Sequence, residues 1–260
     1  MTEKLDHLQS LLRAHAPLLV AYSGGVDSTC LLAVAHRTLG NEVLGVIADS
    51  PSLPRKALAS ALSVAKRLKV RIEVIATREL ENSLYVNNPP NRCYFCKAEL
   101  FSRMNALAAK RRFAAIAYGE NADDPADLRP GSRAAAQFAV LAPLKQAGLT
   151  KNDVRHLSRI YGLPTADAPA QPCLSSRIPY GTPVTSEALS LVERGEEAMR
   201  ALGFRIFRVR FLPPSGARVQ VAPDEMPSLA EVGARLFEAL REAGFDCIEI
   251  DPQGYRGPSL

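Results

Sequence analysis

The stretch that decides the fold is Pro17-Leu18-Leu19-Val20-Ala21-Tyr22-Ser23-Gly24-Gly25-Val26-Asp27-Ser28. Its apolar first half is typical of a buried strand, which stops at the two glycines, and a helical pattern begins at about Ser28. A strand, a glycine turn and a helix N-terminus together predict an anion site. Free backbone N–H groups and the helix dipole converge on such a turn.

The residue types around this turn narrow the ligand. Gly24 and Gly25 let the backbone approach a phosphate closely, and the hydroxyls of Ser23 and Ser28 flank the turn. A carboxylate suits an anion site only if a cation accompanies the anion, so we interpret Asp27 as a ligand for the Mg²⁺ of a nucleotide. The stretch lacks the Gly-Lys-Ser/Thr of a Walker A loop and the Gly-x-Gly-x-x-Gly of a dinucleotide site.

The hexapeptide Ser23–Ser28 resembles the pyrophosphate loop (PP-loop) of the ATP pyrophosphatases, a superfamily that includes GMP synthetase, NAD synthetase and tRNA thiolases. The resemblance implies ATP binding, cleavage between the α and β phosphates, and adenylation of a substrate. The structural alternative is an ordinary glycine-rich turn between a strand and a helix.

Composition sets broad limits. A chain of 260 residues with 47% hydrophobic content can form one large domain or two modest ones. No apolar run approaches a membrane span and the first residues lack the form of a signal peptide, so we expect a cytoplasmic protein with no membrane partner. The formal charge of +5 suits anionic substrates. The sequence has no dense block of basic residues with interleaved aromatics, which weakens the case for RNA binding.

Alternating patterns predict an α/β fold. Strands are expected at 17–22, 42–48, 70–76 and 113–118, with helices at about 28–40, 53–68 and 97–111 between them. This order predicts a doubly wound, Rossmann-like parallel sheet. Ligands of such sheets bind at the carboxyl ends of the strands, so the PP-loop, Asp49-Ser50 and Gly119-Glu120-Asn121 are expected to gather in one crevice.

A second domain is predicted after a break near residue 168. Residues 163–183 are rich in Pro, Ala and Ser and show little periodicity. Beyond them the pattern predicts a helix at 186–202, strands at 204–211 and 217–221, a helix at 225–243 and a strand at 245–250. We therefore expect domains at 1–167 and 168–260, the second a small α+β domain.

Three of the five cysteines form a metal-binding pattern. Cys93 and Cys96 make a Cys-x-x-Cys pair and Cys173 lies in the predicted linker. Three thiolates favour an iron–sulfur cluster with one iron left open. A zinc site or redox pair, or plain buried thiols, are the alternatives. Cys30 and Cys247 are expected to be small buried hydrophobic residues.

Three further segments are specific. They are Pro172-Cys173-Leu174-Ser175-Ser176-Arg177-Ile178-Pro179-Tyr180-Gly181, Gly119-Glu120-Asn121-Ala122-Asp123-Asp124 followed by Asp127-Leu128-Arg129-Pro130-Gly131, and Gly203-Phe204 with Arg208-Val209-Arg210. With the PP-loop they resemble the LarE family of ATP-dependent sulfur transferases over nearly the whole chain.

The resemblance implies a role in making the nickel-pincer nucleotide cofactor of lactate racemase. The implied substrate is pyridinium-3,5-biscarboxylic acid mononucleotide, of which a carboxylate is adenylated with MgATP and converted to a thiocarboxylate. One branch of the family takes sulfur from a single cysteine, which becomes dehydroalanine. Another uses three cysteines and a [4Fe–4S] cluster carrying an extra sulfide, and this chain matches it. Sacrifice of Cys173 is the alternative. The resemblance also implies a homo-oligomer, and a sulfide or sulfur-donor system is the expected partner.

Roles in the nucleotide site follow from this mechanism. The PP-loop amides, Ser23 and Ser28 are expected to bind the β and γ phosphates, and Asp27 to hold Mg²⁺. Asp49 and Ser50 are expected to contact the adenosine half, although Ser50 also suits an N-cap or turn. Asn121, with its acidic neighbours, is a candidate to position the nucleotide or a metal, or else belongs to a polar loop.

Roles in the substrate site rest on arginines, which bind carboxylates and phosphates in a bidentate manner. We expect Arg177, Arg208 and Arg210 to bind the substrate, supported by Lys97. Arg208 and Arg210 alternate with Val209 and should share one strand face, which is otherwise a solvated face. Glu196 is a weaker candidate for a metal or substrate contact.

Three other functions fit parts of the pattern. A PP-loop tRNA thiolase would need a basic RNA surface, and a synthetase of the NAD synthetase kind would not need the cysteines. A non-catalytic nucleotide sensor would release no pyrophosphate.

Overall fold

The computed structural model describes residues 1–125 and 130–255, which form two compact units. Unit 1 is Met1–Glu79 with Asn91–Gln171, and unit 2 is Leu80–Pro90 with Pro172–Leu260. The sequence predicted a single boundary near residue 168, whereas the chain also enters unit 2 at 80–90. Of the segments that carry the family resemblance, residues 127–129 lie outside the described residues.

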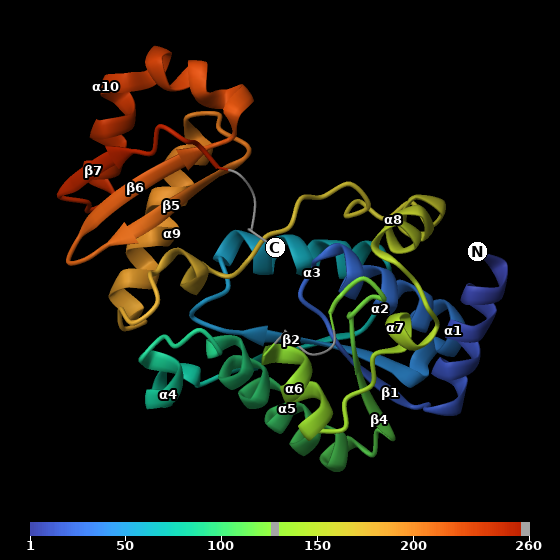
Figure 1. Ribbon diagram of the computed structural model, residues 1–260. Coiled ribbons are helices and arrows are strands. Elements are labelled where there is room, and N and C mark those ends of the chain that lie inside the picture. The colour runs from blue at the N-terminus through green and yellow to red at the C-terminus, as the bar shows by residue number, and fades with distance from the viewer. Residues whose placement is uncertain (126–129, 256–260) are drawn as a thin grey trace. The chain divides into compact units, whose positions relative to one another are not determined.

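Unit 1 contains a parallel sheet with the strand order β3-β2-β1-β4 (Figure 1). Its strands are β1 (Leu18–Ala21), β2 (Val43–Asp49), β3 (Ile72–Ala76) and β4 (Ala115–Tyr118). In register, Leu18 pairs with Val43 on one side and with Ala115 on the other. The parallel arrangement confirms the predicted α/β fold class.

Helices cover both faces of this sheet, because its central strand is apolar on both sides. Leu18 and Val20 of β1 pack into one cluster of buried side chains, and Leu19 packs into the other. The first cluster receives helices α1 (Thr2–Ala14), α2 (Val26–Leu39), α3 (Arg55–Arg67), α7 (Pro143–Gln146) and α8 (Lys151–Ile160). The second receives α5 (Arg92–Arg111) and α6 (Pro130–Gln137). This is the doubly wound architecture that the sequence predicted.

The strand order places a topological switch point between β1 and β4. The chain runs from β1 outward to β2 and β3, and then returns to the opposite side of β1 as β4. Crevices for ligands in open α/β sheets form at such points. The PP-loop follows β1 and Gly119 follows β4, so both lie at the carboxyl ends of neighbouring strands.

Gly119 allows the end of β4 to approach the first turn of α2. A Cβ atom at this position would lie 2.7 Å from the backbone nitrogen of Ser28 and 2.9 Å from the carbonyl carbon of Asp27. Backbone atoms cannot move aside as the end of a flexible side chain can. A side chain at 119 would therefore displace the PP-loop or β4.

Unit 2 has a mixed sheet with the order β5-β6-β7. Its elements are α4 (Ser83–Val86), α9 (Ser186–Ala201), β5 (Phe207–Leu212), β6 (Gly216–Val221), α10 (Met226–Glu242) and β7 (Cys247–Ile250). β5 and β6 are antiparallel, and β7 joins β6 in parallel. Val209, Val219 and Leu236 are fully buried in its core. Among the described residues, no helix has both the length and the apolarity that crossing a membrane requires.

Replacing Gly119 with alanine tests the close approach at the switch point. Gly119→Ala is expected to lower the free energy of unfolding by about 1–3 kcal/mol, because the added methyl overpacks a backbone contact. Urea unfolding followed by circular dichroism measures this. Gly233→Ala is the control, since its Cβ would meet nothing within 4 Å. That change lies inside α10 and is expected to be neutral or to stabilise by about 0.5–1 kcal/mol. Equal effects of the two changes would contradict the interpretation.

Candidate nucleotide-binding and sulfur-transfer site

The PP-loop is tied together by its own hydroxyl groups. The Oγ atoms of Ser23 and Ser28 lie 3.0 Å apart, and Ser28 Oγ also accepts the Ser23 backbone N–H at 3.2 Å. Gly25 is the N-cap of α2 and provides no side chain to bond the first-turn amides. This helix end therefore has no side-chain cap, and the binding of an anion there stays a prediction.

The loop is also held against α3. Gly24 has a φ of +77°, and a Cβ atom there would lie 2.7 Å from the Cβ of Ala61. The hydroxyl of Tyr22 donates to the carbonyl oxygen of Ala61 at 3.0 Å. Glycine is required at position 24 both by the left-handed backbone conformation and by this contact.

Asp27 has a cationic partner from a distant part of the chain. Lys151 Nζ lies 2.6 Å from Asp27 Oδ2, and Asn121 Nδ2 donates to Asp27 Oδ1 at 3.4 Å. Lys151 is the first residue of α8, whose N-cap Thr150 forms a capping box with Asp153. The Asp27 carboxylate therefore lies beside a lysine at the open end of α2.

The loop after β4 is a hydrogen-bonded polar network. Asn121 is buried, and its Oδ1 accepts the Asp123 backbone N–H at 3.0 Å. Asp123 Oδ2 accepts the Lys151 backbone N–H at 2.7 Å. Glu120 is buried and pairs with Lys145 at 2.9 Å. Asn121 thus contacts Asp27 as part of a hydrogen-bonded network of protein groups. Its role in binding a nucleotide or a metal stays a prediction.

The polar side chains at the end of β2 and just after it bond to other residues of unit 1. Asp49 forms an ion pair with Arg55. The Ser50 hydroxyl donates to Glu79 and accepts the Ser52 backbone N–H at 3.0 Å. The turn role considered for Ser50 is therefore present, and adenosine binding by Asp49 and Ser50 stays a prediction.

Cys93 and Cys96 lie at the start of α5. The sequence predicted this helix from about Lys97, but it begins at Arg92, so both cysteines are helical. Residues three apart lie on one helix face, so the two thiols can serve one site. Cys93 is exposed and Cys96 half-buried, and none of the five cysteines is in a disulfide. Lys97, one turn further, has its Nζ 4.6 Å from the ring centroid of Tyr118.

Cys173 belongs to unit 2 and has a hydroxyl partner. Ser175 Oγ lies 3.7 Å from Cys173 Sγ and 2.8 Å from the hydroxyl of Tyr85. Tyr85 and Ser175 are fully buried, whereas Cys173 is half-buried, so only the Tyr85–Ser175 contact is shielded from water. Tyr85 belongs to the 80–90 excursion, in which Asn88 Nδ2 also donates to the carbonyl of Pro179 at 2.7 Å. The excursion therefore anchors the segment that carries Cys173.

The other two cysteines differ from each other. Cys30 is buried, as predicted, and burial raises the pKa of its thiol to about 12. Cys247 is exposed at the start of β7, so the prediction that it is buried is wrong. An apolar strand pattern does not reveal that an end residue faces solvent. Within residues 1–125 and 130–255, no group of three or more His, Cys, Asp or Glu side chains is close enough together to hold a metal ion.

Arg177 is buried and bonds the backbone of the segment that carries Cys173. Its Nε and Nη2 atoms contact the two carboxylate oxygens of Glu196 at 2.7 and 3.0 Å. Its Nη1 donates to the carbonyls of Pro172 and Cys173 at 2.5 and 2.9 Å. Glu196 also contacts Arg200 at 3.2 Å. The Glu196 carboxylate is thus bonded to two guanidinium groups, which favours positioning of Arg177 over metal binding.

Arg208 and Arg210 share the half-buried face of β5, opposite Val209, as the alternation predicted. Arg210 Nη1 donates to the carbonyl of Ser176 at 2.9 Å. The pKa values of both guanidinium groups are lowered, first by burial and then by the positive charge of Arg177. Clustered positive charge is costly unless an anion accompanies it, so this face is suited to bind a phosphate or carboxylate.

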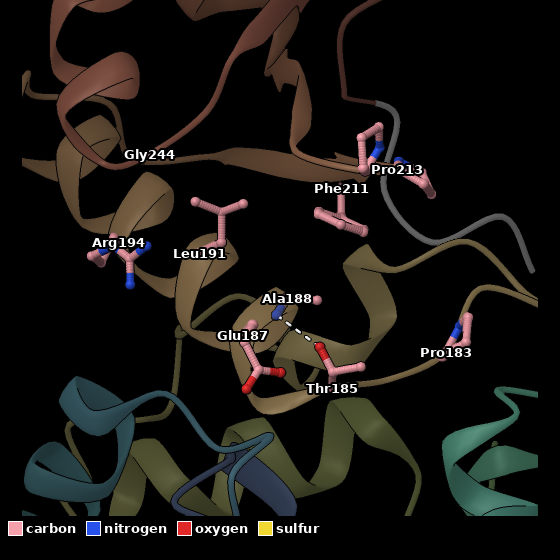
Figure 2. Close-up of a pocket in the computed structure, with 10 residues that line it drawn as sticks. Pro183, Thr185, Glu187, Ala188, Leu191, Arg194, Phe211, Pro213 and Gly244 are labelled. Atoms are coloured by element: carbon pink, nitrogen blue, oxygen red, sulfur yellow. Dashed lines mark hydrogen bonds between the residues drawn. The ribbon is translucent and has the colours of Figure 1, made fainter.

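Unit 2 also contains a groove of about 430 Å³. Figure 2 shows Leu191 and Phe211 along it, with Arg194 and Glu187 on the α9 side. Arg194 is already bonded to the Ala243 carbonyl at 2.8 Å. None of the predicted site residues lines this groove.

Comparison with known proteins identifies the family. The chain is 37% identical to an uncharacterised Synechocystis protein over 100% of this chain and 97% of that protein. It is 32% identical to the pyridinium-3,5-bisthiocarboxylic acid mononucleotide synthase of Lactiplantibacillus plantarum, over 98% of this chain and 93% of that protein. This chain belongs to the LarE family. It is also 29% identical to the GMP synthase of Thermomicrobium roseum, over 70% of this chain and 39% of that protein. No protein-family model matches the chain.

For this LarE-family chain, the sequence did not single out Lys151, Ser175 and Tyr85. Lys151 lies 124 residues from Asp27, and Tyr85 lies 90 residues from Ser175. The segment Leu149-Thr150-Lys151 carries a recognisable N-cap, which could have drawn attention to the lysine that follows it. Ser175 was quoted only as part of the family segment.

Replacing Lys151 tests its part in the PP-loop site. Lys151→Met is expected to weaken MgATP binding about tenfold, because one charge-assisted hydrogen bond near the phosphates is lost. Isothermal titration calorimetry measures the dissociation constant. Lys110→Met, at an exposed position near the end of α5, is the control for the change in net charge. Equal affinities of the two variants would contradict a role for Lys151.

Proposed function

We propose that this chain is an ATP-dependent sulfur transferase that converts a carboxylate of pyridinium-3,5-biscarboxylic acid mononucleotide to a thiocarboxylate. The observation that carries the proposal is the similarity, over 98% of the chain, to a protein named as the synthase of the bisthiocarboxylic product. The PP-loop at a topological switch point supports it, because adenylation requires ATP. The reaction would serve the nickel-pincer nucleotide cofactor of lactate racemase.

The first half-reaction activates the carboxylate. A carboxylate oxygen attacks the α phosphorus of ATP, the bond to the β phosphate breaks, and an acyl-adenylate and pyrophosphate result. The open amides of α2, with Ser23 and Ser28, bind the departing phosphates in this scheme. Asp27 would hold Mg²⁺, and Lys151 beside it would add positive charge where the pyrophosphate leaves.

The substrate would be bound by guanidinium groups. Arg208 and Arg210 are the proposed contacts for its phosphate and carboxylates, because burial and then the charge of Arg177 lower their pKa values, and a bound anion would offset both effects. Arg177 would not contact the substrate, since its own donors already bond Glu196 and two carbonyls. It would instead position Arg208, Arg210 and the segment that carries Cys173. Lys97 and Glu196 stay weaker proposals, and unit 2 is the proposed unit of substrate binding and oligomerisation.

The second half-reaction replaces oxygen with sulfur. A sulfur nucleophile forms a C–S bond to the acyl carbon, and AMP leaves with the electrons of the broken C–O bond. The proposed thiolate donors of a cluster are Cys93 and Cys96, which share one helix face, and Cys173, the third cysteine of the sequence pattern. A [4Fe–4S] cluster on these thiolates would supply an exchangeable sulfide at its open iron. Ser175 would keep the Cys173 sulfur oriented.

The alternative source of sulfur is Cys173 itself. Its thiolate would attack the acyl-adenylate and release AMP, and elimination of the Cβ–S bond with loss of the Cα proton would leave dehydroalanine. The three-cysteine pattern favours the cluster route, because the sacrificial route has no use for Cys93 and Cys96.

Pyrophosphate release tests the first half-reaction. With MgATP and the pyridinium mononucleotide, the wild type is expected to release pyrophosphate, and Asp27→Asn to slow this by about 100-fold or more, as loss of metal-assisted charge stabilisation does. Asp6→Asn, at an exposed position on α1, is the control. The proposal would be refuted if the rate of pyrophosphate release did not depend on the pyridinium mononucleotide, or if it were unchanged in Asp27→Asn. A salt-sensitive gel shift with bulk tRNA would favour a tRNA thiolase.

Iron content tests the source of sulfur. Anaerobic reconstitution with iron and sulfide is expected to give about four irons per chain. Single alanine changes at Cys93, Cys96 or Cys173 should lower that content, whereas the exposed Cys247→Ala should not. Unchanged iron in all three triad variants would exclude the cluster. A protein lighter by the elements of H₂S after turnover would establish the sacrificial route.

A further inference from the structure

A second cavity of unit 1 lies outside the nucleotide site. It has a volume of about 350 Å³ and is lined by the later parts of α2 and α3 and by the chain from Tyr161 to Pro164. None of its lining residues belongs to the PP-loop or to the loop after β4. Ligand pockets begin at about 300 Å³, so this cavity has room for a small molecule.

The charged side chains that line the cavity are all basic. His36, Arg37 and Arg67 line the cavity, and no aspartate or glutamate does. Within the described part of the chain, neither guanidinium has an ion pair or a hydrogen bond. Arg177, by contrast, is paired with Glu196. The cavity is therefore a concave surface with excess positive charge.

Arg37 is held in place by an aromatic ring. Its guanidinium carbon lies 4.1 Å from the ring centroid of Tyr161. Such stacking fixes the plane of a guanidinium and leaves its N–H edge available. Burial raises the pKa of the Tyr161 hydroxyl, partly offset by the charge of Arg37, so this hydroxyl is protonated at neutral pH and can donate.

Helix ends explain only part of this charge. Basic residues in last turns offset the partial negative charge of helix C-termini, and α2 and α3 both carry them. His36 has that role, because its Nδ1 lies 3.2 Å from the Gly40 carbonyl oxygen. Arg37 instead stacks on Tyr161, and Arg67 bonds no carbonyl in the described residues. Two guanidinium groups thus line the cavity without a hydrogen bond or an ion pair to any described residue.

We propose that this cavity is a second anion-binding site, which takes a small phosphate ester or polycarboxylate held by Arg37, Arg67 and the Tyr161 hydroxyl. The apolar wall formed by Val64 and Leu163 would contact the uncharged part of the ligand. The site goes beyond the proposed sulfur transfer and does not depend on it.

Calorimetric titration of the full chain tests the site, with inorganic phosphate and citrate as probes. Mg²⁺ and α,β-methylene-ATP are present throughout to occupy the PP-loop, and binding that the Arg37→Gln/Arg67→Gln change leaves intact is assigned to the arginine face of β5 and not to this cavity. The Arg37→Gln/Arg67→Gln double variant is expected to bind at least about tenfold more weakly than the wild type. The control is Arg13→Gln/Lys66→Gln, which removes the same charge from exposed positions outside the lining and should stay within about twofold.

Each outcome bears on the proposal. Saturable binding of phosphate alone would identify a phosphate-ester site, and binding of citrate alone a polycarboxylate site. Tyr161→Phe keeps the ring under Arg37 and should cost about threefold by loss of one hydroxyl donor. The proposal is overturned if the wild type binds neither probe up to about 10 mM, or if the Arg37→Gln/Arg67→Gln variant binds the probes as tightly as the Arg13→Gln/Lys66→Gln control does. Pyrophosphate release by the wild type would be unaffected by that result, so the two proposals fail separately.

Discussion

The contact between the end of β4 and the first turn of α2 is the constraint on which the nucleotide site depends. It requires glycine at residue 119, because a Cβ atom there would lie 2.7 Å from the Ser28 nitrogen. In the same first turn of α2, Asp27 is contacted by Asn121 and Lys151. A helix end without a side-chain cap would otherwise be satisfied by water alone. Here it lies among fixed polar groups, which is the arrangement that electrostatic stabilisation of a reacting phosphate requires.

Unit 2 relies on a different constraint, the buried pair of Arg177 and Glu196. Both side chains are almost fully buried, and such a pair is stable only when its remaining donors are satisfied. The carbonyls of Pro172 and Cys173 supply those partners, so the pair also shapes the segment that carries the cysteine. Burial lowers the pKa values of Arg208 and Arg210, and the positive charge of Arg177 lowers them further. One interaction thereby links the cysteine segment to the arginine face of β5.

Predictions from local patterns agreed well with the structure. The strand, glycine turn and helix around Ser23–Ser28 formed as expected, and so did the shared face of Arg208 and Arg210. Predictions that depended on the three-dimensional surroundings of a residue were less accurate. Cys247 is exposed although its strand is apolar, and Cys93 and Cys96 lie on a helix that was expected to begin later. The excursion of residues 80–90 into unit 2 was not anticipated, because its anchors, Tyr85 and Asn88, bond partners some 90 residues away.

The sequence by itself determined the order of the elements, the open helix end and the family, since periodicity, turn residues and short motifs are properties of neighbouring residues. Tertiary structure alone decided which groups meet: Lys151 with Asp27, Ser175 with Tyr85, and Arg37 with Tyr161. Most of these contacts join residues far apart in the chain. They arise from the strand order of the sheet and the packing of helices on it, and no spacing within the sequence encodes them.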